Sequence, residues 1–380
     1  MWVVWGAIAV GSFLFLTIVD DLIQRKHAIL RNFPIIGHFR YLLEAIGPEL
    51  RQYIVTSNDE ELPFNRDQRR WVYASSKKQD NYFGFGTDSD LEQSSNYLII
   101  KHSAFPIPSP TPDDPDYDPY YTVPVAKVMG GYRNRRRAFR PPSIVNVSAM
   151  SFGSLSGNAI HALNAGSCLS GCLHNTGEGG ISPHHLQGGD LIWQIGTGYF
   201  GCRDEQGRFD LDRLVETTQE HSSVRAIELK LSQGAKPGLG GILPSSKITP
   251  EIAAIRGIPM GQDCISPSAH TAFSDADSLL DFVEQVAEAT GLPVGIKSAV
   301  GEMDLWHDLA RLTDTTDRGL DFITIDGGEG GTGAGPLVFT DRVALPFKIG
   351  MSRVYRVFAE RGLHEKILFQ GSAKLGFPEM

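Results

Sequence analysis

Cysteine is scarce in this sequence, which has only four cysteines in 380 residues. Four thiols are too few to hold a chain of this length together, so a disulfide scaffold is excluded. Cys168 and Cys172 are four residues apart and His174 follows them, a spacing that would allow a metal site. Because no second cysteine pair supports such a site, we expect buried free thiols in a reducing compartment.

The chain also lacks an excess of positive charge. It has 35 lysines and arginines against 44 acidic residues, a formal net charge of −9, which argues against non-specific nucleic-acid binding. Residues 133–140 are an exception, with five arginines in eight positions. We interpret that cluster as a solvated or acid-paired entry to the main domain. A hydrophobic content of 41% is enough for a large α/β core.

Long hydrophobic runs are absent apart from Trp2–Val19, which contains no charged residue. Eighteen such residues are just enough to span a bilayer as a helix. A basic leading region and a small-residue cleavage site are both missing, so a cleaved signal peptide is not indicated. Arg25, Lys26 and Arg31 follow the run, which predicts a cytoplasmic location for the rest of the chain. We therefore expect a single-pass membrane anchor over residues 1–21; the alternative is a buried helix of a soluble protein.

Residues 22–141 form a helical and irregular N-terminal region in this interpretation. An amphipathic helical pattern over Leu22–Tyr73 is interrupted at Pro34 and Pro48. Asn81–Tyr121 combines an aromatic and glycine-rich run with many prolines. That composition is typical of an extended arm that wraps a neighbouring domain.

From Pro142 to residue 380 strand patterns alternate with helical patterns, which indicates a parallel sheet with helical crossovers. Strands are expected near residues 144–148, 172–175, 226–231, 262–265, 293–297, 322–326 and 366–370. Helices are expected over Asn158–Leu169, Leu211–His221, Ala276–Thr290, Asp304–Thr313 and Arg342–Arg361. This order predicts a TIM (β/α)₈-type barrel that is truncated after strand seven. A doubly wound open sheet is the alternative, but Ser148–Gly157 lacks the Gly-x-Gly-x-x-Gly pattern expected there.

Three strands lead directly into glycine-rich or small-residue stretches. In Ala226–Gly241, apolar and polar residues alternate before four glycines, and Lys230, Gln233 and Lys236 stand at the strand end. Ile144–Gly153 and Phe322–Gly335 have the same build. Ligands of β/α proteins bind at the carboxyl ends of the strands, so a cationic end favours a phosphate or a dicarboxylate. The alternative is an ordinary strand followed by a solvated loop.

Several of these strand ends together resemble the FMN-binding barrel domain of glutamate synthases. The matching runs are Ser148–Ser156, Asn175–Gly180, Lys230–Gly238 and Gly330–Ala334, in the same order and spacing from about Pro142 to the end. With the anchor, the run Asn32–His38 looks like the membrane-anchored, stand-alone glutamate synthase domain-containing proteins. Accidental likeness to another flavin barrel, such as a 2-hydroxy-acid oxidase, is the alternative.

The resemblance implies FMN as cofactor and a set of site residues. The implied cofactor-binding residues are Ala149, Met150, Ser151, Asn175, Thr176, Gln233, Lys297, Gly328, Gly330, Gly331, Thr332, Gly333, Gly371 and Ser372. The implied catalytic residues are Glu178, Lys230, Gln233 and Lys236. Backbone groups of Ala149–Ser151 would hold the flavin N5, and Lys297 would stabilise charge at N1 and the C2 carbonyl of reduced flavin. Lys230 and Lys236 would meet substrate carboxylates, whereas Glu178 would position an imine or relay a proton. A lysine at a sheet end can instead simply pair with an acid such as Glu228.

The family reaction reduces 2-iminoglutarate, formed from 2-oxoglutarate and ammonia, by hydride from FMN. The sequence contains no amidotransferase domain, so ammonia and electrons would come from separate proteins. No cysteine cluster matches the family's iron–sulfur ligands, so that cluster is not expected. Alternatives are an FMN enzyme acting on another oxo or imino acid, and a non-catalytic, membrane-tethered flavin-binding subunit.

The last expectation concerns the end of the chain. In FMN barrels the loops after strands seven and eight grip the phosphate. Gly371–Gly376 would be the first of these loops, and no eighth strand follows it. We therefore expect a fragment of a longer protein, with an exposed region near Asn146 and Phe369.

Overall fold

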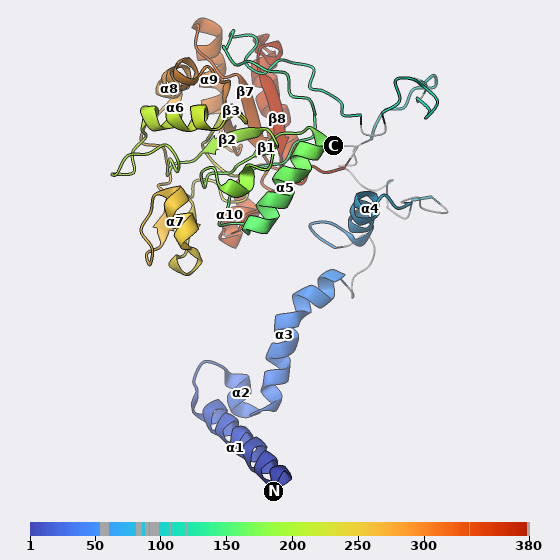
Figure 1. Ribbon diagram of the computed structural model, residues 1–380, viewed down its shortest axis with the longest axis vertical. Helices are drawn as coiled ribbons and strands as arrows, with labels where there is room; N and C mark the ends of the chain where they lie inside the picture. Colours follow the sequence, from blue (N-terminus) through green and yellow to red (C-terminus); the bar gives the residue numbers. More distant parts are fainter. Residues whose placement is uncertain are drawn as a thin grey trace. The chain divides into compact units, whose positions relative to one another are not determined.

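The computed structural model describes residues 1–53, 61–80, 86–87, 91, 99–106, 108, 110–118, 121–333 and 335–377. The chain divides into two compact units, Met1–Ile99 and Ile100–Met380 (Figure 1). Asn81–Phe85 and parts of the proline-rich stretch lie outside the described residues. The described part of that stretch, from 99 to 118, contains no helix or strand, as its composition predicts.

The first unit consists of helices. They are α1 (Trp2–Ile23), α2 (Ala28–Asn32), α3 (Ile36–Tyr53) and α4 (Arg66–Ser76). Asp21, near the end of α1, is buried and accepts hydrogen bonds from the backbone nitrogen of Ile35 at 2.9 Å and from His38 Nε2 at 2.8 Å. The chain breaks at Pro34 as expected, but Pro48 lies inside α3, so the expected break there is wrong. A proline removes one helical hydrogen bond, which a helix can tolerate without ending.

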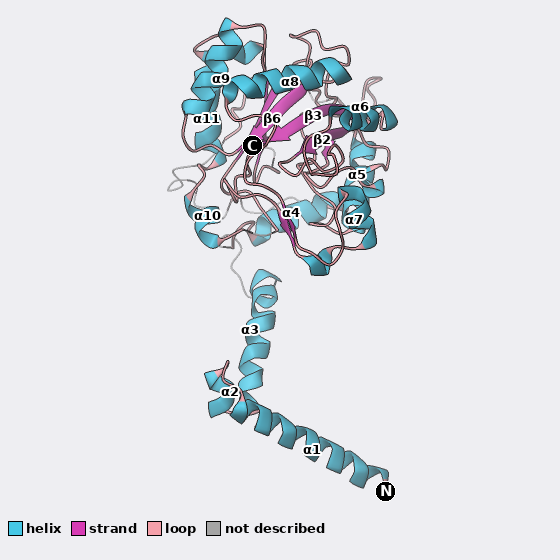
Figure 2. Ribbon diagram, turned by 90° about the vertical axis from the view of Figure 1, so that its left-hand side faces the viewer, coloured by secondary structure: helices cyan, strands magenta, loops and turns pink. Residues whose placement is uncertain are grey.

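The second unit is built on a curled, parallel, six-stranded sheet with helices on its outside (Figure 2). The strands, in spatial order, are β1 (His174–Asn175), β2 (Leu191–Ile195), β3 (Val224–Lys230), β6 (Val294–Ser298), β7 (Phe322–Asp326) and β8 (Leu368–Ser372). Every neighbouring pair is parallel. This is the α/β half-barrel expected of a (β/α)₈-type barrel that lacks strands.

Three of the sequence-based strand predictions need correction. Residues 144–148 make only a single parallel bridge, Val147 to His174, which places them beside β1 without a ladder. Leu191–Ile195 was not predicted as a strand because all five residues are buried, so its pattern does not alternate. Residues 262–265 do not join the barrel: β5 (Cys264–Ile265) pairs antiparallel with β4 (Ile242–Leu243). Five of the seven expected strands therefore lie in the barrel sheet, and β2, which was not predicted, is its sixth strand.

The edges of the sheet do not meet in a ladder. Among the described residues β8 pairs only with β7, and the contact across the gap is between the hydroxyl oxygens of Ser148 and Ser372, 3.0 Å apart. A closed barrel of this type has eight strands. Asn146 is exposed and Phe369 is half-buried, in agreement with the exposed seam expected there.

The helices of the second unit largely follow the predicted pattern. They are α5 (Gly157–Ser170), α6 (Leu211–Glu220), α7 (Pro250–Arg256), α8 (Ala276–Thr290), α9 (Asp304–Thr315), α10 (Leu337–Arg342) and α11 (Phe347–Ala359). α8 shows why the prediction succeeds: Asp275 caps its first turn and Gly291, at φ +74°, ends it. The helix expected over Arg342–Arg361 begins only at Phe347 because Pro346 occupies the N-cap, and α7 was not predicted.

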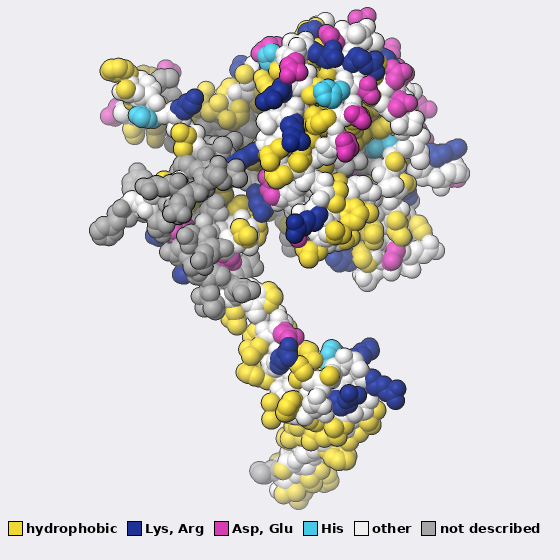
Figure 3. All heavy atoms as spheres, turned by 180° about the vertical axis from the view of Figure 1, so that it is seen from behind, with side chains coloured by type: hydrophobic (Ala, Val, Ile, Leu, Met, Phe, Trp, Pro, Cys, Tyr) yellow, Lys and Arg dark blue, Asp and Glu magenta, His cyan; other side chains and the backbone are white. Residues whose placement is uncertain are grey.

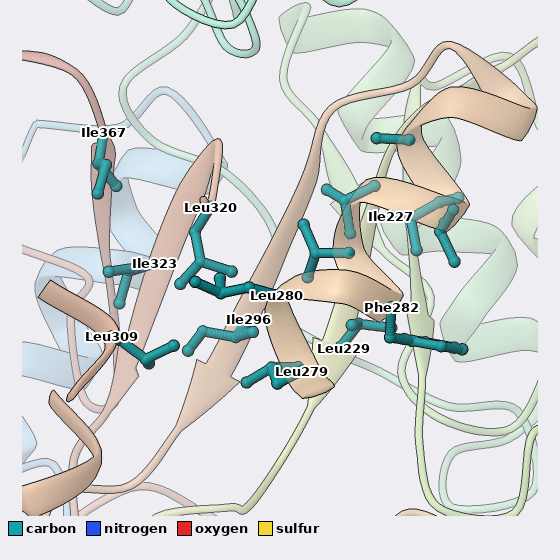
Figure 4. Close-up of a cluster of buried hydrophobic side chains, with 14 of the residues drawn as sticks. Ile227, Leu229, Leu279, Leu280, Phe282, Ile296, Leu309, Leu320, Ile323 and Ile367 are labelled. Carbon is teal, nitrogen blue, oxygen red and sulfur yellow. The ribbon is translucent and has the colours of Figure 1, made fainter. Parts of the chain in front are cut away.

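The core lies between the outer face of the sheet and the helices. In Figure 4 side chains of β3, β6 and β7 meet those of α8 and α9. The labelled members of this cluster are Ile227, Leu229, Leu279, Leu280, Phe282, Ile296, Leu309, Leu320, Ile323 and Ile367. Removal of this apolar surface from water is the main force that holds helices against the sheet. The strand backbones are thereby fixed, and so are the side chains at their ends.

A separate apolar cluster closes the bottom of the barrel. Met129 and Phe139 form an antiparallel bridge and pack against Leu173, Ile192 and other side chains inside the sheet. The neighbouring arginines fix this segment. Arg135 binds Glu284 at 2.6 Å and the buried Asp321 at 2.9 Å.

The arginine cluster is thus largely tied down, and its acid pairing is confirmed for Arg133 and Arg135. Arg136, Arg137 and Arg140 donate hydrogen bonds to backbone carbonyls instead. These contacts connect residues 133–140 to the ends of helices and strands far away in the sequence. The cluster therefore has a structural role at the N-terminal end of the barrel.

The cysteines differ in part from the expectation of buried thiols. All four are free, but only Cys202 is buried; Cys168 is exposed, and Cys172 and Cys264 are half-buried. Cys168 lies in the last turn of α5, on its solvent side, where the weak amphipathic pattern of that helix gave no indication of its position. Within the described ranges, no group of three or more His, Cys, Asp or Glu side chains could hold a metal ion.

Candidate functional site

Polar side chains gather where the parallel strands end. Lys230 ends β3, Asp326 ends β7 and Ser372 ends β8, while Lys297 is the penultimate residue of β6. All four are buried or nearly so, although each is polar or charged. In a parallel β/α sheet the carboxyl ends of all strands lie on the same side, and binding sites form on that side. The order of the strands therefore brings together residues that are more than a hundred positions apart.

Glu178, Lys230 and Gln233 form one connected group. Lys230 Nζ lies 2.7 Å from Glu178 Oε1 and donates to Gln233 Oε1 at 3.1 Å. Gln233 Nε2 in turn donates to the backbone oxygen of Gly331 at 2.9 Å. Three of the predicted site residues are thus in contact, and the amide of Gln233 links them to the glycine-rich loop after β7.

Two further cations lie near Glu178. Burial lowers the pKa of Lys236, and the Glu178 carboxylate partly offsets this effect. Burial also lowers the pKa of Arg256, which ends α7 and donates to the backbone oxygen of Phe152 at 3.1 Å. Among the described residues, Lys236 Nζ has no hydrogen-bond partner and neither has the buried Arg256 Nε. Two buried cationic groups therefore have donors to spare.

The charges decide the ionisation of Glu178. Burial alone would raise the pKa of its carboxyl, but Lys230, Lys236 and Arg256 together outweigh burial and lower that pKa. Glu178 is therefore a carboxylate at neutral pH. With one acid against three cations, this cluster carries a surplus of positive charge that suits an anionic ligand.

His270 and Tyr199 support Lys230 from behind. His270 Nε2 lies 2.9 Å from the backbone oxygen of Lys230, and His270 Nδ1 lies 3.1 Å from the Tyr199 hydroxyl. Backbone nitrogens of Thr271 and Ala272 donate to the same hydroxyl, so it must donate its own proton to His270 Nδ1. His270 Nε2 then carries the hydrogen that reaches Lys230. This chain of contacts fixes the strand end from which Lys230 projects.

Lys297 belongs to a second polar cluster and has an acidic partner that was not predicted from the sequence. Its Nζ is 3.3 Å from Asp326 Oδ1, and both side chains are about 6% exposed. Asp326 Oδ2 accepts a hydrogen bond from the backbone nitrogen of Gly234 at 2.7 Å. Asp326 therefore joins the end of β7 to Lys297 and to the loop after β3. Its position at the end of β7, directly before the glycines, was the available signal.

The loop after β3 has to approach β7 closely. A Cβ atom on Gly234 would lie 1.9 Å from the backbone oxygen of Gly327. That distance is far inside van der Waals contact, so only glycine fits. At Gly371 a Cβ would lie 2.4 Å from the end of the Phe347 ring, so there the side chain of Phe347 would have to move.

Glu228 lies deeper in the barrel and is not the partner of Lys230. Its carboxylate is fully buried and accepts hydrogen bonds from Asn175 Nδ2, Gln194 Nε2 and Thr324 Oγ1, at 2.8, 2.7 and 2.6 Å. The alternative in which Lys230 merely balances Glu228 is therefore wrong. The side chain of Asn175 is used inside the barrel by this contact, so its amide is committed to the fold.

The remaining predicted residues surround the two polar clusters, one at Lys230 and one at Lys297. Ala149, Met150 and Ser151 follow the first strand position, and the backbone nitrogen of Met150 donates to the oxygen of Asn175 at 3.1 Å. The hydroxyl of Thr176 donates to Gly177 O and accepts from Gln194 N, so Thr176 holds the fold. The glycine-rich loop after β7 contains Gly328, Gly330, Gly331, Thr332 and Gly333. A Cβ atom added to Gly331 would meet no other atom within 4 Å, whereas the backbone nitrogen of Gly328 donates to Leu345 O.

A cavity of about 490 Å³ opens between the two free edges of the sheet. One wall contains Ser148 and Ala149, and the other contains Gly371 and Ser372. Lys297 contributes to its lining as well. The size lies within the usual range for small-molecule sites, although the cavity also exposes the barrel interior that a further strand would cover.

Comparison with known proteins identifies the family. Residues 132–378 match the conserved region in glutamate synthase. This chain belongs to the glutamate synthase family. It is 36% identical to the glutamate synthase large subunit-like protein YerD of Bacillus subtilis over 404 residues, which cover 98% of this chain and 76% of YerD.

Shorter matches extend to glutamate synthases of other organisms. The chain is 36% identical to the archaeal-type glutamate synthase [NADPH] of Thermotoga maritima, over 58% of this chain and 40% of that protein. It is 35% identical to the archaeal glutamate synthase [NADPH] of Methanocaldococcus jannaschii, over 59% and 41%. The chain thus spans less than half the length of these two relatives. These relatives place it among the glutamate synthase-like oxidoreductases.

The sequence analysis overlooked Arg256, His270, His185 and Asp326. Arg256 was missed because it lies in α7. That helix belongs to a segment after β3 that contributes no strand to the barrel sheet. His270 contacts the backbone at the end of β3 and His185 contacts the backbone of Met150, and a single sequence contains no signal of such long-range contacts.

Proposed function

We propose that this chain is an FMN-dependent oxidoreductase that reduces 2-iminoglutarate, formed from 2-oxoglutarate and ammonia, to glutamate. The observation that carries the proposal is the surplus of buried cationic donors around Glu178, contributed by Lys236 and Arg256. A dicarboxylate supplies the two negative charges that this cluster lacks. Ammonia and electrons would come from separate proteins, and no iron–sulfur cluster is assigned.

The residues present fit FMN by their donor chemistry. Lys297 is a buried cation at a strand end, suited to the electron-rich N1 and C2 carbonyl side of a reduced flavin. The backbone nitrogen of Ser151 has no acceptor among the described residues, which leaves it available to the flavin N5. Gln233, Ser372 and the glycines of the loop after β7 would complete the contacts. When bound, reduced FMN supplies the hydride.

The substrate's carboxylates would meet Lys236 and Arg256. Charge-assisted hydrogen bonds to these two groups are stronger than neutral ones, and they would place the imine carbon within the site. Addition of a hydride to the carbon of the protonated imine would give a neutral amine, which would take up a proton from water to become an ammonium group. The Glu178 carboxylate is suited to hold the protonated imine, because its lowered pKa keeps it ionised. Lys230 fixes the carboxylate through their 2.7 Å contact.

The test starts from the purified full chain. A yellow flavin spectrum should be present, and addition of 2-oxoglutarate plus ammonia should reoxidise the dithionite-reduced flavin. If a different oxo acid reoxidises the flavin and 2-oxoglutarate does not, the result would favour an FMN enzyme acting on another oxo or imino acid. A flavin that no oxo acid reoxidises would favour a flavin-binding subunit, and a colourless intact protein would reject the proposal altogether.

Substitution of Lys297 tests the cofactor part. Lys297→Ala should keep the fold but lose flavin affinity or reductive rate, because a cation is removed from a developing anion. Removal of one such contact costs on the order of 3 kcal/mol in comparable sites. Unchanged flavin content together with an unchanged rate would contradict the assignment.

Substitution of Lys236 tests the substrate part. Lys236→Ala should raise the KM for 2-oxoglutarate by roughly tenfold or more, since one charge-assisted hydrogen bond contributes about 1.5–3 kcal/mol. The matched control is Lys247→Ala, which removes an exposed lysine of the same loop region. An equal KM for both variants would show that Lys236 does not bind the substrate.

We further propose that α1 anchors the chain in a membrane with the catalytic unit in the cytoplasm. α1 contains a 20-residue apolar span, Val4–Ile23; an 18-residue window within it has a mean hydropathy of 1.8 and is 6% buried. Figure 3 displays hydrophobic side chains over this part of the chain and Lys and Arg side chains beside it. The exposed Arg25, Lys26 and Arg31 support the cytoplasmic orientation.

Deletion of the anchor tests this localisation. A chain that starts at Arg25 should be soluble and still bind flavin, whereas the full chain should pellet with membranes. If the full chain is freely soluble without detergent, α1 does not anchor it.

A further inference from the structure

We propose that His185 is a positioning residue for the flavin: it orients the Met150–Ser151 peptide so that the Ser151 N–H points at the cofactor. This inference rests on the proposed flavin site and adds a residue to it. His185 is fully buried in the short 3₁₀ helix Pro183–His185, and its Nε2 lies 3.0 Å from the backbone oxygen of Met150.

The contacts of His185 determine where its proton lies. The backbone nitrogen of Ser182 donates to His185 Nδ1 at 3.2 Å, and the Ser182 hydroxyl lies 2.9 Å from the same atom. A backbone N–H can only donate, so Nδ1 must be the acceptor. In a neutral imidazole the hydrogen is then on Nε2, which donates it to Met150 O. The interaction is thus directional and belongs to one tautomer.

The environment of His185 favours the neutral ring. Burial lowers the pKa of His185, with the hydrogen bond to Met150 opposing that shift. The ring of His174 lies 5.3 Å away, and burial keeps His174 neutral too. His174 Nδ1 faces Asn164 Nδ2 at 3.4 Å. The half-exposed His184 is the other titratable group near His185, and it lies beside Glu251.

A planar trans peptide transmits the orientation from Met150 to Ser151. In such a peptide the carbonyl of Met150 and the N–H of Ser151 point in opposite directions. The N–H of Met150 is also fixed, because it donates to Asn175 O at 3.1 Å. Because the backbone oxygen and the backbone N–H of Met150 are both held by hydrogen bonds, the direction of the following Ser151 N–H is fixed as well.

Gly177 keeps the nitrogen of Ser151 uncovered. Gly177 has φ +65°, and a Cβ atom at this position would lie 2.7 Å from Ser151 N. Among the described residues no group accepts a hydrogen bond from this nitrogen. A donor that is oriented by a buried histidine and left without a protein acceptor is prepared for a ligand acceptor.

The experiment compares His185→Leu with His185→Asn in the full chain. Leucine removes the donor, whereas the asparagine amide can donate to Met150 O. His185→Leu should weaken FMN binding about tenfold, as loss of a supporting contact does in other sites, and should shift the flavin midpoint potential. His185→Asn should restore much of both. The matched control is His161→Leu, which changes an exposed histidine of α5.

Two results would overturn the inference. One is a folded His185→Leu variant with unchanged FMN affinity and potential. The other is an equal loss in the leucine and asparagine variants, which would indicate a packing role only. Wild-type protein that binds no FMN would instead overturn the proposed function and this inference together.

A measurement on the wild-type chain does not depend on how the variants fold. Addition of FMN should slow hydrogen exchange of the Ser151 amide, because that N–H gains an acceptor. If FMN binds and protects the flanking loops but leaves the exchange of this amide unchanged, His185 does not aim it at the cofactor.

Discussion

Protonation of His174 should make this protein sensitive to acid. The side chain is fully buried beside β2, and among the described residues its Nε2 has no hydrogen-bond partner. Burial, followed by the neighbouring His185, lowers its pKa from 6.5 to about 4. The folded chain therefore binds this proton less readily than the unfolded chain, and stability must fall as the pH drops below 6.5 toward 4.

The magnitude follows from the two pKa values. A difference of about 2.5 units corresponds to a total of about 3 kcal/mol, since one unit is 1.36 kcal/mol. Most of this loss takes place above pH 4, and between pH 7 and pH 5 it amounts to about 2 kcal/mol. Typical total stabilities are 5–15 kcal/mol, so this single group should be measurable.

Urea unfolding followed by tryptophan fluorescence is a suitable assay, because Trp193 and Trp306 are fully buried. The free energy of unfolding of the wild type should fall between pH 7 and pH 5 by about 2 kcal/mol more than that of His174→Gln. His185 and His270, whose pKa values are also lowered by burial, are present in both chains and cancel in the difference. Equal losses in the two chains would refute the reasoning.

Two further predictions concern stability. Arg135→Met should destabilise the fold by about 3 kcal/mol, because it leaves the buried Asp321 without its cation. The control Arg136→Met removes an exposed guanidinium and should cost much less, so equal losses in urea unfolding would contradict the pairing argument. Gly234→Ala should cost about 1–3 kcal/mol, since its Cβ would meet the backbone of Gly327 at 1.9 Å. A thermal denaturation midpoint equal to that of the wild type would show that the loop can yield.

The sequence predicted the barrel-type fold because its periodic elements are strong. β7 and α8 were placed at their observed bounds, since one is a β-branched run that stops at glycines and the other carries both of its caps. β2 was missed because a strand buried on both faces does not alternate. Of the predicted strand at residues 262–265 only Cys264–Ile265 forms, and no local pattern could indicate that it pairs antiparallel, away from the barrel.

The candidate site was predictable in its charged members and not in their partners. Lys230 and Lys297 follow from strand ends that any parallel sheet would bring together. Glu228 and Lys230 are two residues apart on β3 and share a strand face, but the Glu228 carboxylate is already bound by Asn175, Gln194 and Thr324, so Lys230 pairs with Glu178 instead. That choice became visible only once β2 was placed between β1 and β3. Asp326, His185 and their contacts depend in the same way on tertiary neighbours.

The two ends of the barrel use charge in opposite ways. At the N-terminal end Arg135 pairs with two acids, Glu284 and Asp321, so the charges there stabilise the fold. At the carboxyl end Glu178 faces three cations, of which Lys236 and Arg256 retain free donors among the described residues.

Unpaired buried charge is costly, and a fold keeps it only where another group compensates for it. An anionic ligand would supply that compensation at the carboxyl end. The N-terminal end needs no ligand because Arg135 already has acidic partners there. Binding of a dicarboxylate should therefore stabilise the chain, and the stabilisation should depend on Lys236 far more than on Arg135. This difference in charge balance supports the proposal that the ligand binds at the carboxyl end, by an argument that does not use the family resemblance.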